Sequence, residues 1–187
     1  MKIGRLFPDL LATLGRAASS EAGFTRTLKQ LVALSGARAG GLRFRPGDGA
    51  TMDVIVGARR GSALERWIQA RLGRPARGVR VEDLTEAPPG LRPRDTVLLS
   101  AALGDRAHAV GGLVLLGPGG ARGLGRETIP PSFPREFGHA LEQVWRLRQR
   151  TVRLEVINQV MALTATTLPL DRVYAKTAEA VARLVRF

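Results

Sequence analysis

The feature that most constrains this chain is an apolar seam that runs through residues 137 to 168. Residues taken at alternating intervals of three and four are apolar or small at almost every position. This is the a/d spacing of a two-stranded coiled coil. The seam positions are Phe137, Ala140, Val144, Leu147, Thr151, Leu154, Asn158, Met161, Ala165 and Leu168. Because such a seam must be buried against another helix, the spacing predicts a long helix that dimerises. A module that ends in this way usually passes its state along the dimer axis.

A helix that covers its own sheet would show a similar apolar stripe, and this explains residues 137 to 144 equally well. From Leu147 onward the seam continues for about six turns beyond any sheet that the sequence predicts, and leaving it in water would be costly. Asn158 falls at an a position, where paired asparagines favour a parallel, in-register pair. Thr151 and Ala165 weaken the packing, which suits a helix that shifts rather than locks. We therefore expect a homodimer.

Length and charge narrow the class of protein. The 187 residues suffice for one domain with a helical extension, and a hydrophobic content of 44% is enough for a core. The formal net charge is +13, but the basic residues are nearly all arginine, with Lys2, Lys29 and Lys176 as the exceptions. This bias, with many Ala, Gly and Leu residues, is typical of GC-rich coding. Without a groove-reading element, charge alone does not indicate a nucleic-acid partner, and we expect none.

Cysteine is absent from the sequence, which excludes disulfides, thiolate chemistry and Cys-ligated metals. Pro8 and Asp9 fall where a signal peptide would need its apolar core. No apolar run approaches the roughly 18 residues of a membrane span. We expect a cytoplasmic protein that does not contact a membrane.

The remaining patterns predict helices, then strands, then the seam helix. Amphipathic helices are expected at 10–17 and 24–34, the second ended by Gly36. Ser62 and Glu65 are predicted to form a capping box, in which the Ser62 hydroxyl accepts from the Glu65 amide and the Glu65 carboxylate reaches back to the Ser62 amide. The crossover helix that they start is expected to end at Gly73. Ser132 and Pro134 begin the seam helix. The predicted strands are residues 41–45, 52–57, 79–81, 96–103 and 108–116.

This order of elements predicts an α+β fold, with terminal helices packed on one face of an antiparallel sheet and the crossover helix on the other. The stretch from Val110 to Pro118, VGGLVLLGP, resembles the penultimate strand of GAF domains, and a variable loop and a long helix follow it as in that family. The resemblance covers about residues 8 to 150. It implies a sensory or regulatory module of a bacterial signalling protein, in which a shift of paired helices reports binding to a downstream domain.

With this resemblance, we expect the chain to divide into a GAF-like core, a coiled-coil signalling helix and the start of a second, truncated GAF-like domain. These parts are residues 1–131, 132–168 and 169–187. The second domain is suggested by a shift of 150 residues, which aligns Phe24 with Tyr174 and Leu31 with Val181. Any two amphipathic helices can be brought into register in this way, so a chance similarity stays open. The repeat would make the chain the N-terminal GAF of a tandem-GAF protein such as a sensor histidine kinase.

The sequence shows no catalytic motif. His108 and His139 are the only histidines, and neither has a second ligand at metal-binding spacing, so we interpret both as structural. GAF domains that reduce methionine sulfoxide need cysteines, those that attach bilins usually need one, and the motif of the cyclic-nucleotide-binding members is not recognisable. We expect a non-catalytic module without metal, haem or bilin, with any kinase or cyclase domain downstream.

In GAF domains, ligands bind between the sheet and the crossover helices. By that resemblance, the residues that line a pocket here are Trp67, Arg71, Met52, Val54, Val110 and Gly112. Seven arginines between residues 59 and 80 crowd this region, which would suit an anionic ligand. The plainer interpretation is a solvated arginine face with Trp67 in the core. A ligand-free dimerisation scaffold therefore stays open beside a ligand-binding sensor, as does, more distantly, a basic nucleic-acid-binding domain.

Overall fold

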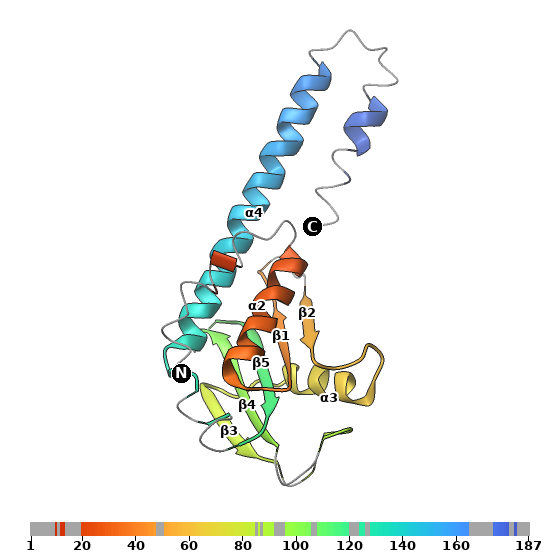
Figure 1. The fold of residues 1–187 in the computed structure, drawn as a ribbon. Helices are drawn as coiled ribbons and strands as arrows, with labels where there is room; N and C mark the ends of the chain where they lie inside the picture. Colours follow the sequence, from red (N-terminus) through yellow and green to blue (C-terminus); the bar gives the residue numbers. More distant parts are fainter. Residues whose placement is uncertain are drawn as a thin grey trace. The chain divides into compact units, whose positions relative to one another are not determined.

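The computed structural model describes residues 10, 12–13, 20–47, 51–84, 86, 88–91, 96–105, 108–119, 124–125, 128–164, 174–179 and 182. The chain forms two compact units, Met1–Glu142 and Gln143–Phe187, and the boundary falls inside its long helix. Figure 1 labels the elements, which are α2 (Ser20–Ser35), β1 (Ala39–Phe44), β2 (Met52–Val56), α3 (Ala63–Leu72), β3 (Val79–Asp83), β4 (Val97–Gly104), β5 (Ala109–Gly117) and α4 (Phe133–Thr164).

The predicted strands, the crossover helix and the seam helix are all present in the expected order, and their ends differ from the prediction by a few residues. Of the first predicted helix, residues 10, 12 and 13 are described, and all three are helical. The suggested second domain, residues 169–187, lies mostly outside the described residues, of which it contains 174–179 and 182.

The five strands form one antiparallel sheet in the order β2-β1-β5-β4-β3. The central strand β5 pairs with β1 on one side and with β4 on the other. Residues 111 to 117 of β5 are all buried, as expected for a strand with neighbours on both edges and helices on both faces. The prediction that the strands at 96–103 and 108–116 are adjacent is confirmed.

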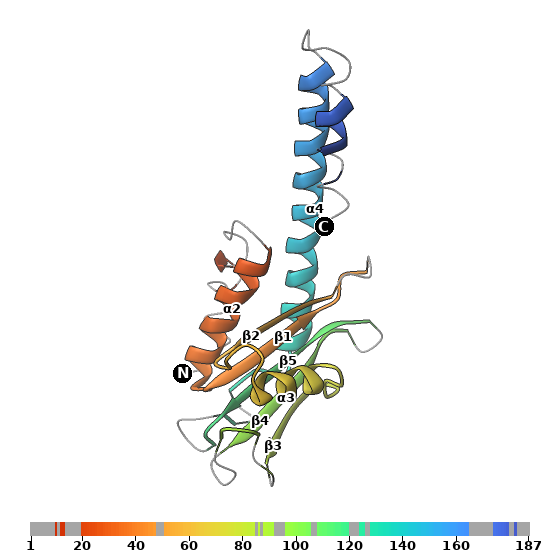
Figure 2. The ribbon, with the colours of Figure 1, turned by 90° about the vertical axis from the view of Figure 1, so that its right-hand side faces the viewer.

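Two neighbouring glycines of β1 show how the helices are placed on the sheet. A Cβ at Gly40 would lie 2.9 Å from a methyl of Val32 in α2, and one at Gly41 would lie 2.8 Å from a methyl of Leu72 in α3. Because successive residues of a strand face opposite sides, α2 and α3 cover opposite faces of the sheet. Figure 2 shows the same arrangement, with the first turns of α4 on the face that carries α2.

The face that carries α2 holds much of the core. Phe24 of α2 packs against Phe44 of β1 with ring centroids 5.5 Å apart. Phe133 and Phe137 of the first turns of α4 stack at 5.1 Å, and Phe137 is 0% exposed. Burying a side chain of this size contributes about 2 to 3 kcal/mol, so the burial of Phe24 and Phe137 stabilises the packing of α2 and the start of α4.

Local signals account for the ends of α2 and the start of α3. At the end of α2, Gly36 has φ +70°, and the Gly36 and Ala37 amides donate to the carbonyls of Ala33 and Val32 at 3.4 and 3.0 Å, which is a Schellman motif. At the start of α3, the Ser62 hydroxyl accepts from the Glu65 amide at 3.1 Å, as predicted.

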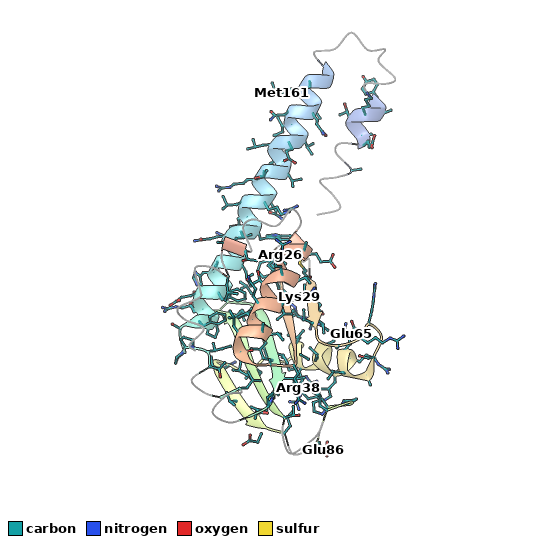
Figure 3. The ribbon with its side chains drawn as sticks, in the orientation of Figure 1. Arg26, Lys29, Arg38, Glu65, Glu86 and Met161 are labelled. Carbon is teal, nitrogen blue, oxygen red and sulfur yellow. The ribbon has the colours of Figure 1, made fainter. Side chains whose placement is uncertain are left out.

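The second half of the predicted capping box is different. The Glu65 carboxylate accepts from the Gly61 amide and not from the Ser62 amide. The reason is that the Ser62 amide already donates to the Arg59 carbonyl, at 3.0 Å, in the preceding turn. Glu65 is labelled in Figure 3.

Candidate functional site

A cluster of the chain's own apolar side chains lies between α3 and the sheet. The cluster consists of Ala39, Ile68, Leu72, Leu98, Val114 and Leu116, each at most 1% exposed. Trp67 is partly buried and packs against this cluster from the side. On the outer side, the Arg71 guanidinium lies 5.0 Å from the centroid of the Trp67 ring, which is the distance of a cation–π contact.

The residues predicted to line a pocket are divided between the two faces of the sheet. Gly112 lies on the α3 face beneath the end of that helix, where a Cβ would be 3.0 Å from Pro75. Val110, two residues earlier on β5, shares that face. Met52 and Val54 pair with Phe44 and Leu42, which face α2. The structure therefore brings Gly112 near the end of α3 and places Met52 and Val54 on the opposite side of the sheet.

An ion pair on the α3 face was not predicted from the sequence. Arg43 and Asp53 are cross-strand partners in the β1–β2 register, and the guanidinium donates to both carboxylate oxygens, at 2.6 and 2.5 Å. The side chains are 15% and 25% exposed. Hydrogen bonding to Asp53 raises the pKa of Arg43, against the opposing effect of burial. Because the Arg43 guanidinium is already paired with the Asp53 carboxylate, it links β1 to β2 and is not available to bind an anionic ligand.

A hollow of about 1140 Å³ lies elsewhere, at the end of the sheet where the β4–β5 turn meets the start of α4. Its walls come from the segment after α3, from β3, from the two central strands at their turn, and from the first turn of α4. The described residues that line it are Pro75, Arg77, Gly78, Val79, Ala102, Gly104, Asp105, Ala109, Pro131, Ser132, Pro134 and Arg135.

The β4–β5 turn is held directly against α4. A Cβ at Gly138 would lie 2.7 Å from the Cα of Gly104, so the helix and turn backbones meet with no side chain between them. Next to this contact, the Asp105 carboxylate lies 3.0 Å from Nε2 of His139. His139 thus joins the helix to the turn, whereas His108 is exposed at the end of the turn. Among the described residues, no three His, Asp or Glu side chains gather as ligands for a metal ion.

The exposure of the residues in the predicted seam differs along α4. Phe137 is 0% exposed within the first unit, whereas Leu147, Leu154 and Met161 are 62%, 59% and 63% exposed in the second. Thr151 and Asn158 are exposed as well. Met161 is labelled on α4 in Figure 3. No helix among the described residues, α4 included, is both long enough and apolar enough to cross a membrane.

Comparison with known proteins gives similarities of fold. No family model matches the sequence, and no curated protein does. Among solved structures, the GAF domain of a candidate sensor histidine kinase from Pseudomonas syringae pv. tomato is 19% identical with a TM-score of 0.49, covering 82% of this chain and 91% of that one. The A. aeolicus nlh2 GAF domain in an inactive state is 12% identical with a TM-score of 0.43, covering 77% and 95%.

A third structure, the GAF domain from an Acinetobacter phosphoenolpyruvate-protein phosphotransferase, is 10% identical with a TM-score of 0.46, covering 77% of this chain and 93% of that one. At these identities such similarities concern the fold alone. The chain itself has the predicted arrangement, a five-stranded antiparallel sheet with α2 and the start of α4 on one face and α3 on the other. The fold is α+β with a long C-terminal helix, and its order of elements is the one expected from the resemblance to GAF domains.

Proposed function

We propose that this chain is a non-catalytic regulatory module of a cytoplasmic signalling protein, and that it acts as a dimer in which α4 pairs with α4 of a second copy. The observation that carries the proposal is the row formed by Leu147, Leu154 and Met161, which recur every seven residues on α4 and are 59% to 63% exposed in a single chain. Leaving such side chains in water costs about 1 to 2 kcal/mol each. A partner helix of the same spacing would bury all three.

Charges beside the seam favour a parallel pair. With Thr151 and Asn158 at a positions, Arg150 occupies a g position and Glu155 the e position of the next heptad. In a parallel coiled coil, a g residue lies next to the e residue of the following heptad in the partner, so Arg150 would meet Glu155 of the other copy. Both side chains are exposed and available for this contact.

The position of the seam supports a regulatory role. The first turns of α4 are fixed to the sheet by the buried Phe137 and by the close contact of Gly138 with Gly104. The seam lies further along the same helix, so a small displacement at the sheet would bear on the paired segment. The GAF-like fold is compatible with such a relay. In this proposal, a downstream domain, such as that of a histidine kinase, receives the signal.

A ligand-free dimerisation scaffold is the second candidate. The buried cluster around Ile68 and Leu72 favours it, because these side chains lie in the region where a GAF ligand was expected. The two candidates share the dimer and differ in whether an added small molecule changes it. Both predict a dimeric protein at micromolar concentration.

The dimer can be tested by light scattering of the protein and of the double variant Leu147→Glu, Leu154→Glu. We expect a dimeric mass for the unchanged protein and a folded monomer for the variant, because each glutamate would place a charge in the seam. The control is Arg153→Glu, Gln159→Glu, which changes exposed residues of the same helix outside the seam and should stay dimeric. A monomeric unchanged protein at tens of micromolar would contradict the proposal.

A further inference from the structure

The hollow at the end of the sheet contains two arginines without an anionic partner. Arg77 comes from the segment after α3 and Arg135 from the first turn of α4. Among the described residues, neither guanidinium forms a hydrogen bond or an ion pair. This distinguishes them from Arg43, whose charge is neutralised by Asp53, and from Arg80, which pairs with Glu82.

The carboxylate in the described lining does not cancel these charges. Asp105 lies against His139 on α4, 3.0 Å from its Nε2, which orients the carboxylate toward the helix. The rest of the described wall is largely proline, alanine, glycine and valine, with the Ser132 hydroxyl as a further polar group. A cationic ligand would be repelled by this lining, whereas an anion with an apolar body matches it.

We propose that this hollow binds a small organic anion, whose phosphate or carboxylate groups are held by Arg77 and Arg135. A guanidinium presents parallel N–H groups that match either kind of oxyanion. The volume of about 1140 Å³ exceeds what a single inorganic ion needs and is slightly above the roughly 300 to 1,000 Å³ of small-molecule pockets. The site differs from the one expected between α3 and the sheet.

The hollow lies where a bound ligand could affect the position of α4. The same wall contains Gly104 and Asp105 of the β4–β5 turn and Ser132 and Arg135 at the start of the helix. A ligand that draws Arg135 inward would therefore act on the junction where Gly138 rests on the turn. This regulatory consequence rests on the proposed function, whereas the binding itself does not.

Isothermal titration calorimetry on the full chain tests the site. The probes are inorganic pyrophosphate for phosphate groups and citrate for carboxylates, each against sodium chloride of equal ionic strength. We expect saturable binding of at least one probe at one site per chain. Arg77→Gln and Arg135→Gln should each weaken it by about tenfold, because each removes one charged hydrogen-bonding group. Circular dichroism verifies that both variants are folded.

The matched controls are Arg59→Gln and Arg60→Gln, which remove equal charge from exposed arginines outside the hollow. They should bind like the unchanged protein. Equal losses in all four variants would mean attraction to a basic surface and would overturn the proposal, as would the absence of saturable binding for both probes. Light scattering of the same samples separates the two claims. A dimer that binds neither probe would refute the ligand site alone, and a monomer that binds a probe would refute the dimer alone.

Discussion

Gly138 meets the backbone of the β4–β5 turn without a side chain between them, and replacing it with alanine should destabilise the protein. At an ordinary helical position, alanine in place of glycine stabilises by about 1 kcal/mol. Here the added methyl would lie 2.7 Å from the Cα of Gly104 and 2.9 Å from the carbonyl carbon of Leu103. Carbon atoms pack best at about 3.5 to 4.0 Å, so the overlap is about 1 Å.

The atoms in the way belong to the backbone and cannot rotate aside, so α4 must move away from the turn. Such overpacking costs about 1 to 3 kcal/mol, and near its upper end it outweighs the gain in helix propensity. We expect Gly138→Ala to lower the free energy of unfolding by about 1 to 2 kcal/mol in urea denaturation.

The control for this experiment is Gly47→Ala, which adds the same methyl where, among the described residues beyond its chain neighbours, no atom lies within 4 Å. It should leave stability unchanged or raise it by about 0.4 to 1 kcal/mol, because alanine restricts the unfolded chain. If Gly138→Ala is as stable as the unchanged protein, or more stable, the close contact between α4 and the turn is not present in solution.

Two further substitutions test local structure by the same denaturation assay. Asp53→Ala should cost about 1 to 3 kcal/mol because it leaves the largely buried guanidinium of Arg43 unpaired; the double variant Arg43→Met, Asp53→Leu should cost less than the sum of its single changes, and additivity would show that the pair does not interact. Ser62→Ala should lower the free energy of unfolding by about 1 kcal/mol through loss of the hydroxyl that accepts from the Glu65 amide, whereas Ser62→Asp should retain stability. Equal stability of the unchanged protein and both variants would exclude a capping role for Ser62.

The elements were predictable because their signals are local. Gly36 as the end of α2 and Ser62 as the cap of α3 can be identified within a few residues of sequence, and both are confirmed. The position of residues on the faces of the sheet was harder to predict. Gly40 and Gly41 carry no side chain, so the start of β1 shows no apolar alternation from which a face could be assigned.

The same lack of a local signal explains why the residues predicted to line one pocket lie on two faces of the sheet. Met52 and Val54 could be placed on a face only through their register with β1, and the loop between these strands is too long for the turn type to fix that register. The hollow was beyond sequence reasoning for a related reason. Arg77, Asp105 and Arg135 come from three separate segments, and the pairing of β3 with β4 and the docking of α4 bring them to one place.

Cysteine cross-linking tests the central claim, the parallel pairing of α4, most directly, since the native sequence contains no cysteine. Leu147→Cys and Leu154→Cys occupy successive d positions, which face their own copies in a parallel, in-register pair. Both should form a disulfide-linked dimer on mild oxidation, whereas Arg153→Cys, outside the seam, should not. An antiparallel pair can bring at most one of the two d positions opposite itself. Cross-linking at only one of them, at neither, or equally at all three positions would contradict the parallel dimer.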